Sequence, residues 1–381
     1  MQHFANMAQV PKAVIPLEDQ SMGNAQATEP SRADEVMLER IRALRSLPSM
    51  HGLREEVAAL KQRLRSNGIR WDLPEAEFLL ARLDQVAASH TLERARYYLS
   101  RLERSLSQVR TNGVNDINLN RWQEYTDILT DSLWLIERRD NSGVHSADYW
   151  GNFIPQIPYQ MMRRYTRRGE WVLDPFAGAG TTLIEGQRLG RHTLGIELNP
   201  AVAERARRLI AAEPNPYHTV AEVIVADSCT LDHRALLAQY GQRSVQLVIM
   251  HPPYFDIIKF SDDPRDLSNA ASVEDFLGRL GQVVARTAEV LDTGRYLALV
   301  IGDKYADGEW IPLGFRAMEV VIGAGFTLKS IVVKNFEQTT AKRTQKELWR
   351  YRALLGGFYI FKHEYVFIFR KGPGREKRGK G

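Results

Sequence analysis

The 381-residue sequence contains a single cysteine, Cys229. One thiol excludes an internal disulfide and any zinc site built from cysteines, and it is typical of a reducing compartment. The sequence also lacks an apolar run of about eighteen residues, the length of a membrane-spanning helix. Its first residues lack a basic segment followed by a long apolar one, so we expect no signal peptide. We therefore expect a cytoplasmic protein that does not bind membranes.

A local excess of charge of one sign is found mainly at the C-terminus. The net charge is +5, but the last eleven residues carry five basic side chains and one acidic one, which leaves +1 for the rest of the chain. Hydrophobic residues at 44% and charged residues at 25% are typical of a globular protein. Residues 371–381 are predicted to form a basic, disordered tail, and any nucleic-acid surface elsewhere must come from local patches.

The first 110 residues contain no strand pattern. Residues 1–34 are polar with scattered proline and glycine, and we expect a disordered leader. Residues 35–110 repeat leucines at helical spacing, which predicts a module of four helices. Because basic and acidic residues alternate along these helices, we interpret the module as a packing surface for a homodimer or a partner subunit. Target recognition is the alternative.

Residues 111–370 predict an α/β domain. A helix is expected from Asn120 to Leu135, and from Trp171 onward apolar strands alternate with amphipathic helices. This alternation predicts a mostly parallel sheet with helices on both faces. We expect seven strands, the last two of which form a terminal antiparallel hairpin.

The ends of four successive predicted strands carry polar motifs. The first is the stretch WVLDPFAGAGTTLIEG, a strand that passes through a glycine turn into a helix N-terminus. Such a turn allows a ligand to approach the backbone and the free N–H groups of the helix. Glu197, Asp227 and the stretch HPPY, which starts at His251, follow the next three strands. The carboxyl ends of parallel strands are where α/β folds bind ligands.

In this order, the motifs DPFAGAG, ELNP and HPPY resemble those of the S-adenosylmethionine-dependent methyltransferases, and more narrowly the enzymes that modify adenine N6 or cytosine N4 in DNA. The resemblance covers about Asn115 to Arg370. It implies a Rossmann-like class I methyltransferase fold and S-adenosylmethionine as cofactor, with Glu197 on the ribose hydroxyls and Asp227 at the adenine amino group. The cofactor-binding residues that it implies are Phe153, Pro155, Asp174, Phe176, Gly178, Gly180, Thr181, Thr182, Glu197, Leu198, Asp227 and Ser228.

The resemblance implies a catalytic role for His251, Pro252, Pro253 and Tyr254. A base amine is a poor nucleophile because its lone pair is delocalised into the ring. In this family a polar side chain and the carbonyl of the first proline accept its two N–H bonds. Tyr254 is then expected to stack on the base, and Phe255 to add a second apolar wall.

His251 departs from the family, which usually has Asp, Asn or Ser at this position. A neutral imidazole has one acceptor nitrogen and can replace them in only one tautomer. The target base is therefore open, and we expect activity to fall below a pH near ~6.5, the usual pKa of histidine.

Nucleic-acid contacts are expected from the insertion between the last two strands. Basic and aromatic residues interleave there, a pattern that suits phosphate contact and base stacking. The alternative is a surface loop that packs its aromatic rings on the sheet edge. A second basic cluster is the arginine set 163, 164, 167 and 168. The contact residues predicted in the insertion are Lys342, Arg343, Lys346, Trp349 and Arg350.

The sequence thus predicts an enzyme that flips a base out of double-stranded DNA and methylates its exocyclic amine. Such an enzyme would associate with the nucleoid and serve a restriction-modification or other defence system. An RNA methyltransferase, for example of guanine N2 in tRNA, is the first alternative. A non-catalytic subunit that docks DNA or a partner is the second. No histidine spacing suggests a metal site, so none is expected.

Overall fold

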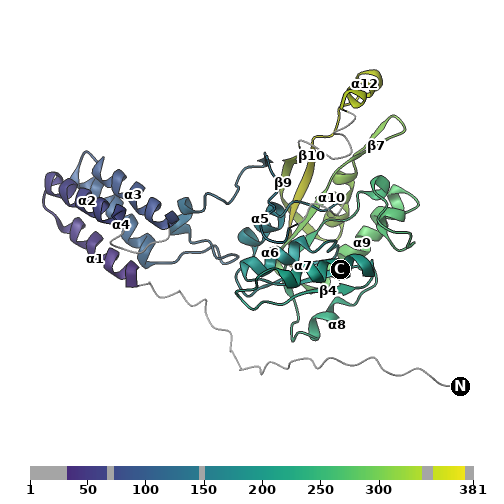
Figure 1. The fold of residues 1–381 in the computed structure, drawn as a ribbon, viewed down its shortest axis with the longest axis horizontal. Coiled ribbons are helices and arrows are strands. Elements are labelled where there is room, and N and C mark those ends of the chain that lie inside the picture. Colours follow the sequence, from purple (N-terminus) through teal and green to yellow (C-terminus); the bar gives the residue numbers. More distant parts are fainter. Residues whose placement is uncertain (1–31, 67–72, 146–150, 337–345, 374–381) are drawn as a thin grey trace, which may run out of the picture. The chain divides into compact units, whose positions relative to one another are not determined.

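The chain divides into two compact units, residues 1–109 and 110–381 (Figure 1). The fold was obtained as a computed structural model, which describes residues 32–66, 73–145, 151–336 and 346–373. Most of the expected disordered leader and tail therefore lies outside the described residues. Two of their boundary residues differ from expectation. Arg32 already begins a helix, and Lys371 is the last residue of a strand, where it pairs with Phe326 and its Nζ donates to the Ala288 and Leu291 carbonyls.

The first unit consists of helices with one shared apolar core. Ser49 and Thr91 cap two of these helices by accepting the backbone N–H groups of Gly52 and Arg94. Leucines at helical spacing, among them Leu53, are buried between the helices, as the periodicity requires. The helices are α1 (Arg32–Ser46), α2 (Met50–Arg65), α3 (Leu73–Ala87) and α4 (Leu92–Ser107).

The second unit is built on a sheet of eight described strands in the order β1-β9-β10-β6-β5-β2-β3-β4. The strands from β4 to β6 are parallel to one another, whereas β10 is antiparallel to both β6 and β9. The predicted α/β class and the antiparallel pairing of the last two strands are thus present. The strands are β1 (Leu133–Trp134), β2 (Trp171–Asp174), β3 (His192–Glu197), β4 (Ala221–Val225), β5 (Val245–Met250), β6 (Leu291–Ile301), β9 (Phe326–Asn335) and β10 (His363–Lys371).

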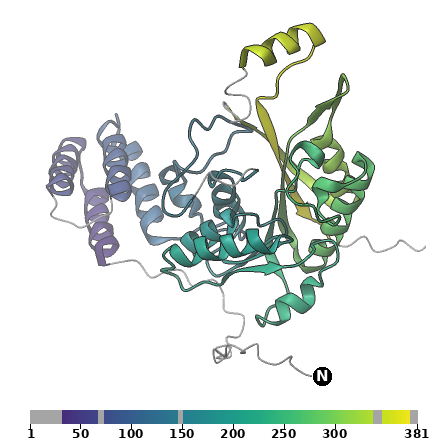
Figure 2. The ribbon, with the colours of Figure 1, turned by 45° about the vertical axis from the view of Figure 1, so that its right-hand side comes forward.

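Helices cover both faces of this sheet, as its apolar central strands require (Figure 2). On one face lie α5 (Gln156–Tyr165), α6 (Thr181–Leu189) and α7 (Pro200–Ala212). On the other lie α8 (His233–Ala238), α9 (Val273–Val290) and α10 (Leu313–Gly323). The chain runs outward from β2 to β4 and then returns to place β5 on the other side of β2. This reversal is a topological switch point, where open α/β sheets bind ligands.

The expected helix from Asn120 to Leu135 is wrong. Only Leu119–Glu124 forms a turn of 3-10 helix, and the two-residue strand β1 follows and pairs with β9. This added edge strand makes the sheet one strand wider than expected. Leu133 is exposed, and Trp134 is buried against β9 and β10, so tertiary packing outweighs the local helical pattern.

Two further elements lie at the carboxyl edge of the sheet. The strands β7 (Lys304–Ala306) and β8 (Glu309–Ile311) form a separate antiparallel ribbon after β6. Helix α12 (Lys346–Gly356) stands in the insertion between β9 and β10. Tyr305 of the ribbon stacks on Phe358, with ring centroids 4.3 Å apart, so part of the insertion packs on the ribbon.

Candidate active site

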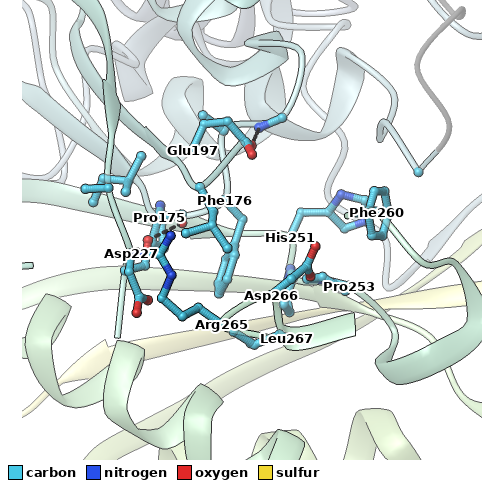
Figure 3. A pocket seen from close by; sticks show the side chains of 18 of the residues that line it. Pro175, Phe176, Glu197, Asp227, His251, Pro253, Phe260, Arg265, Asp266 and Leu267 are labelled. Atoms are coloured by element: carbon cyan, nitrogen blue, oxygen red, sulfur yellow. Dashed lines mark hydrogen bonds between the residues drawn. The ribbon is translucent and has the colours of Figure 1, made fainter. Parts of the chain in front are cut away.

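A pocket that is open to solvent lies at the switch point between β2 and β5 (Figure 3). The carboxyl ends of β2, β3, β4 and β5 all open into it, as expected from their parallel order. Of the residues predicted from sequence, the pocket is lined by Phe153, Phe176, Gly178, Glu197, Leu198, Asp227, Ser228, His251, Pro252 and Pro253.

The glycine turn between β2 and α6 forms the floor of the pocket. Gly178 and Gly180 have φ angles of 50° and 84°, in the left-handed region that disfavours side chains. The backbone N–H of Ala177 donates to the carbonyl of Ile196 at 2.9 Å, which fastens the turn to β3. At Gly178 the turn therefore presents bare backbone to a ligand, beside the side chain of Phe176. Gly180, Thr181 and Thr182 lie behind this surface and do not line the pocket.

Asp174, at the end of β2, is buried beneath the pocket rather than on its wall. Its Oδ1 accepts the N–H of Phe176 at 2.9 Å, whereas Oδ2 has no hydrogen-bond partner among the described residues. Burial raises the pKa of Asp174 to about 6. The residue thus shapes the turn from below.

Glu197 ends β3 with both carboxylate oxygens held by the backbone. Oε2 accepts the N–H of Gly178 at 3.0 Å, and Oε1 accepts that of Asn199 at 2.8 Å. Each oxygen keeps a second lone pair for a ligand. Burial raises the pKa of Glu197, although these N–H groups favour the charged form. A carboxylate oriented in this way can accept two hydroxyl hydrogens of a ligand.

Asp227 and Ser228 follow β4 on the next wall. The hydroxyl of Ser228 donates to the carbonyl of Pro175 at 2.6 Å, and Oδ1 of Asp227 accepts the N–H of Cys229 at 2.9 Å. These bonds tie the end of β4 to the glycine turn and fix the Asp227 carboxylate. The Cys229 thiol has its pKa raised to about 12, mainly by burial, and is therefore protonated and unsuited to act as a nucleophile.

The segment before α5 closes the pocket from the N-terminal side. The hydroxyl of Thr181 donates to Oδ1 of Asn152 at 2.7 Å, and Arg139 Nη1 donates to the carbonyl of Phe153 at 2.8 Å. Asn152 and Phe153 line the pocket, whereas Pro155 is buried at the start of α5 and does not. Its predicted contact with the cofactor stays a prediction, since Pro155 is the N-cap residue of α5.

His251, Pro252 and Pro253 follow β5 and form the wall opposite Glu197. The His251 ring stacks on Phe153, with centroids 4.8 Å apart and planes at 24°. Its Nε2 lies 3.1 Å from the hydroxyl of Tyr254. Burial lowers the pKa of His251 to about 4, so the imidazole is neutral at physiological pH. This corrects the expectation of a transition near the ordinary histidine value.

The two rings expected to stack on a base face the protein instead. Tyr254 does not line the pocket, because its hydroxyl donates to Oε2 of Glu364 at 2.7 Å. Phe255 is buried in the core, and its ring centroid lies 6.2 Å from that of Phe276. A φ angle of 54° at Phe255 turns its side chain inward. The apolar walls come from Phe153 and Phe260.

The loop of residues 255–272, which the sequence offered only as one of three candidates for target recognition, completes the pocket. Residues 255–272 contribute Phe260, Arg265, Asp266 and Leu267 (Figure 3). Asp266 is buried and accepts hydrogen bonds from the hydroxyls of Ser261 and Ser268. The aspartates, proline and arginine in this loop were the available sequence signal for a functional segment. Which of these side chains face the pocket depends on the fold and could not be predicted from the sequence.

The predicted nucleic-acid contacts divide between the two edges of the sheet. Helix α12 carries Trp349 and Arg350, with Arg350 exposed, and Lys346 begins it, whereas Lys342 and Arg343 lie outside the described residues. Because β9 runs parallel to β6, the insertion leaves the sheet at the same edge as the pocket. The four-arginine cluster precedes β2 and thus lies at the opposite edge. There Arg164 and Arg167 donate to the carbonyls of Leu129 and Gly113.

Within the described part of the chain, no helix is long and apolar enough to cross a membrane. In those same residues, no group of three acidic, histidine or cysteine side chains is placed to hold a metal ion.

Comparisons with known proteins agree with the motifs. Residues 88–208 match the family model described as DNA methylase. The type II methyltransferase M.MjaII of Methanocaldococcus jannaschii is 38% identical over 67 residues, 17% of this chain and 13% of that protein. M.MthZI of Methanothermobacter thermautotrophicus is 32% identical over 80 residues, 21% of each chain. M.HindIII of Haemophilus influenzae is 32% identical over 105 residues, 26% of this chain and 32% of that protein. The matches thus span a third or less of the length of each relative. For the part of the chain that they cover, they confirm the predicted resemblance to DNA amino-methyltransferases.

Proposed function

We propose that this chain, which resembles the DNA amino-methyltransferases, transfers a methyl group from S-adenosylmethionine to an exocyclic amine of a DNA base. The target is adenine N6 or cytosine N4. The observation that carries the proposal is the placement of His251 and Pro252 on the wall of the pocket that Glu197 and the glycine turn also line. One pocket thus holds both a seat for a nucleoside cofactor and acceptors for an amine.

The residues present fit the cofactor. Glu197 has free lone pairs that would accept the two ribose hydroxyls, and Asp227 and Ser228 would accept hydrogen bonds from the adenine amino group. The bare backbone of Gly178 lets the methionine part approach the turn. When bound, S-adenosylmethionine supplies a methyl group on a positively charged sulfur. The chain itself contributes alignment and hydrogen-bond acceptors.

At the amine, His251 and the Pro252 carbonyl accept the two N–H groups. This arrangement directs the nitrogen lone pair toward the methyl group and away from the ring. The cofactor would supply the methyl group from its positively charged sulfur, and His251 and the Pro252 carbonyl would hold the amine in place to receive it. One amine proton is afterwards released to water. Phe153 and Phe260 provide apolar surface for a flipped base.

The DNA would be held partly by the insertion. Helix α12 belongs to a segment that leaves the sheet at the pocket edge, and its exposed Arg350 suits phosphate contact. Trp349 is half-buried beneath the guanidinium of Arg352, whose carbon lies 5.3 Å from the ring centroid. The helices of the first unit remain our proposed surface for a second copy or a partner subunit.

The test is methylation of defined nucleic acids. The purified protein is incubated with S-adenosylmethionine carrying a labelled methyl group and with genomic DNA, synthetic duplexes or tRNA, and the modified nucleosides are identified by mass spectrometry. We expect N6-methyladenine or N4-methylcytosine in DNA, and none with a His251→Leu variant. Label in tRNA alone would overturn the DNA proposal. A lack of S-adenosylmethionine binding by calorimetry would overturn the enzymatic one.

A further inference from the structure

A buried chain of hydrogen bonds leads from the sheet to His251. Lys334 of β9 and Glu364 of β10 are directly opposite each other on adjacent strands, and Nζ of Lys334 donates to Oε1 of Glu364 at 2.9 Å. Oε2 of Glu364 accepts the Tyr254 hydroxyl at 2.7 Å. Nε2 of His251 lies 3.1 Å from the same hydroxyl. The four side chains thus form one linear network.

The direction of each hydrogen bond follows from the charge at the far end. Lys334 and Glu364 are 5% and 8% exposed, so each needs the other as a counter-charge. Burial opposes the charged carboxylate, but Lys334, His251 and the Tyr254 hydroxyl together outweigh burial and lower the pKa of Glu364. An ionised carboxylate can only accept hydrogen bonds. Tyr254 must therefore use its single proton on Glu364.

The tautomer of His251 then has one solution. The Tyr254 oxygen has only lone pairs left, so Nε2 of His251 must carry a hydrogen and donate it. A neutral imidazole has one N–H, which leaves Nδ1 as a bare acceptor. None of the described residues forms a hydrogen bond to Nδ1. The structure has several fully enclosed polar atoms without a partner, and Nδ1 does not belong to them, so it is accessible. His251 lines the pocket, so this acceptor is available there.

The ring of Tyr254 is held as firmly as its hydroxyl. A Cβ atom at position 302 would lie 3.0 Å from the ring, so Gly302 at the end of β6 provides the space that the ring occupies. The His251 and Tyr254 rings meet edge to face, with centroids 5.5 Å apart. Phe153 covers the other side of the imidazole. Both the plane and the protonation pattern of His251 are thereby fixed.

We propose that Tyr254, Glu364 and Lys334 are positioning residues that hold His251 in the Nε2–H tautomer, so that Nδ1 accepts a hydrogen of the target amine. This inference rests on the proposed function for the identity of the amine, but the tautomer itself does not. It assigns a role to Tyr254 that differs from base stacking. It also explains how a histidine replaces the smaller acceptors usual in the family.

The tautomer is measured without substrate. In the full-length protein labelled with ¹⁵N-histidine, long-range proton–nitrogen NMR distinguishes a protonated from an unprotonated ring nitrogen, and the signals missing from a His251→Asn variant identify this residue. We expect a protonated Nε2 and an unprotonated Nδ1 at pH 7. Tyr254→Phe, which keeps the ring, should shift the signals toward a mixture of tautomers. A protonated Nδ1 in the wild-type protein would overturn the proposal, whatever the protein methylates.

Kinetics provide the second arm, because an asparagine acceptor needs no tautomer. We expect Tyr254→Phe to lower kcat about tenfold, with the KM for S-adenosylmethionine unchanged, and to lower it less than threefold in a His251→Asn background. An equal loss in both backgrounds would mean that Tyr254 acts only structurally. We choose Tyr254→Phe over a Glu364 variant because removing Glu364 would leave Lys334 charged and buried without its partner, which endangers folding.

Discussion

Phe153 and His251 are 98 residues apart in the sequence, yet their rings stack at a centroid separation of 4.8 Å. The contact joins the segment that closes the pocket to the residue that would accept the target amine. We predict that Phe153→Leu lowers kcat about three- to tenfold, because an aromatic pair contributes about 0.5–1.5 kcal/mol and the loss would fall on the reacting geometry. Single-turnover methylation under saturating cofactor measures it.

The matched control is Phe255→Leu, the same change in a buried ring that does not line the pocket. It should lower the thermal unfolding temperature, because a core ring is replaced by a smaller side chain, while kcat per folded molecule stays within about twofold. A larger kinetic loss for Phe255→Leu than for Phe153→Leu would reinstate Phe255 as a wall of the base site.

Glu197 provides a test of cofactor binding. Glu197→Gln keeps the side-chain length but leaves one oxygen to accept, so either a backbone N–H or a ligand hydroxyl loses its partner. We predict that the Kd for S-adenosylmethionine rises about 10- to 100-fold, the effect of losing one or two charge-assisted hydrogen bonds. Calorimetry measures it. Glu222→Gln, on the exposed face of edge strand β4, should leave the Kd unchanged. An unchanged Kd for Glu197→Gln would remove Glu197 from the cofactor site.

The pH dependence of activity should be flat where an ordinary histidine titrates. The groups that face His251 are Tyr254, Glu364 and Lys334. Burial, together with the Lys334 charge, outweighs the opposing charge of Glu364 and lowers the pKa of His251 to about 4. The imidazole is therefore neutral throughout physiological pH. We predict that the ratio of wild-type to His251→Asn kcat is constant from about pH 5.5 to 8, on both sides of the ordinary histidine pKa. Using the ratio cancels other titrations, including that of Asp174. A ratio that halves near the ordinary histidine pKa would contradict the buried, neutral state.

Much of the fold could be predicted from the sequence because local signals and tertiary packing agree there. The strands β2, β3 and β5 are apolar runs ended by polar residues, and the glycine turn that follows β2 needs the φ angles that only glycine adopts easily. Since parallel strands place their ends at one edge, Glu197 and His251 could be expected to share a site.

What could not be predicted depends on contacts between distant residues. The sequence predicts that Tyr254 stacks on a base. In the structure its hydroxyl instead donates to Glu364, which lies 110 residues later in the chain. The inward turn of Phe255 follows from a positive φ angle that no residue-type rule assigns to phenylalanine. Strand β1 exists because β9 offers an open edge, although its own sequence favours a helix.

Asp174 should make stability depend on pH. Its pKa is about 6 in the folded chain, mainly through burial, against the ordinary 3.8. As the pH rises, the unfolded chain loses this proton at a lower pH than the folded chain does. The free energy of unfolding therefore falls between about pH 4 and pH 6 and stays at the lower value above pH 6. Asp174→Asn cannot ionise, and its Oδ1 can still accept the Phe176 N–H. We predict that it raises the free energy of unfolding by about 2–3 kcal/mol at pH 8, from about 1.4 kcal/mol per pKa unit, and by little at pH 4.

Urea unfolding of the full chain without cofactor, followed by tryptophan fluorescence, measures this effect, because six of the seven tryptophans lie in residues 110–381. The control is Asp232→Asn at an exposed helix cap, where backbone N–H groups lower the pKa. Any pH effect of that change should have the opposite sign. A stability gain for Asp174→Asn that is the same at pH 4 and pH 8 would show that Asp174 is not titrating.

Arg350 tests the nucleic-acid face of the insertion. It is exposed on α12, which belongs to the segment that leaves the sheet at the pocket edge. We predict that Arg350→Gln weakens binding to a DNA duplex and reduces the slope of log affinity against log salt by about 0.9, the value for one lost phosphate contact. Fluorescence anisotropy over a series of salt concentrations measures both. Arg243→Gln is the matched control, because that exposed arginine precedes β5 at the opposite edge of the sheet and should change neither quantity. Equal effects of the two substitutions would mean that charge, rather than position on α12, governs DNA binding.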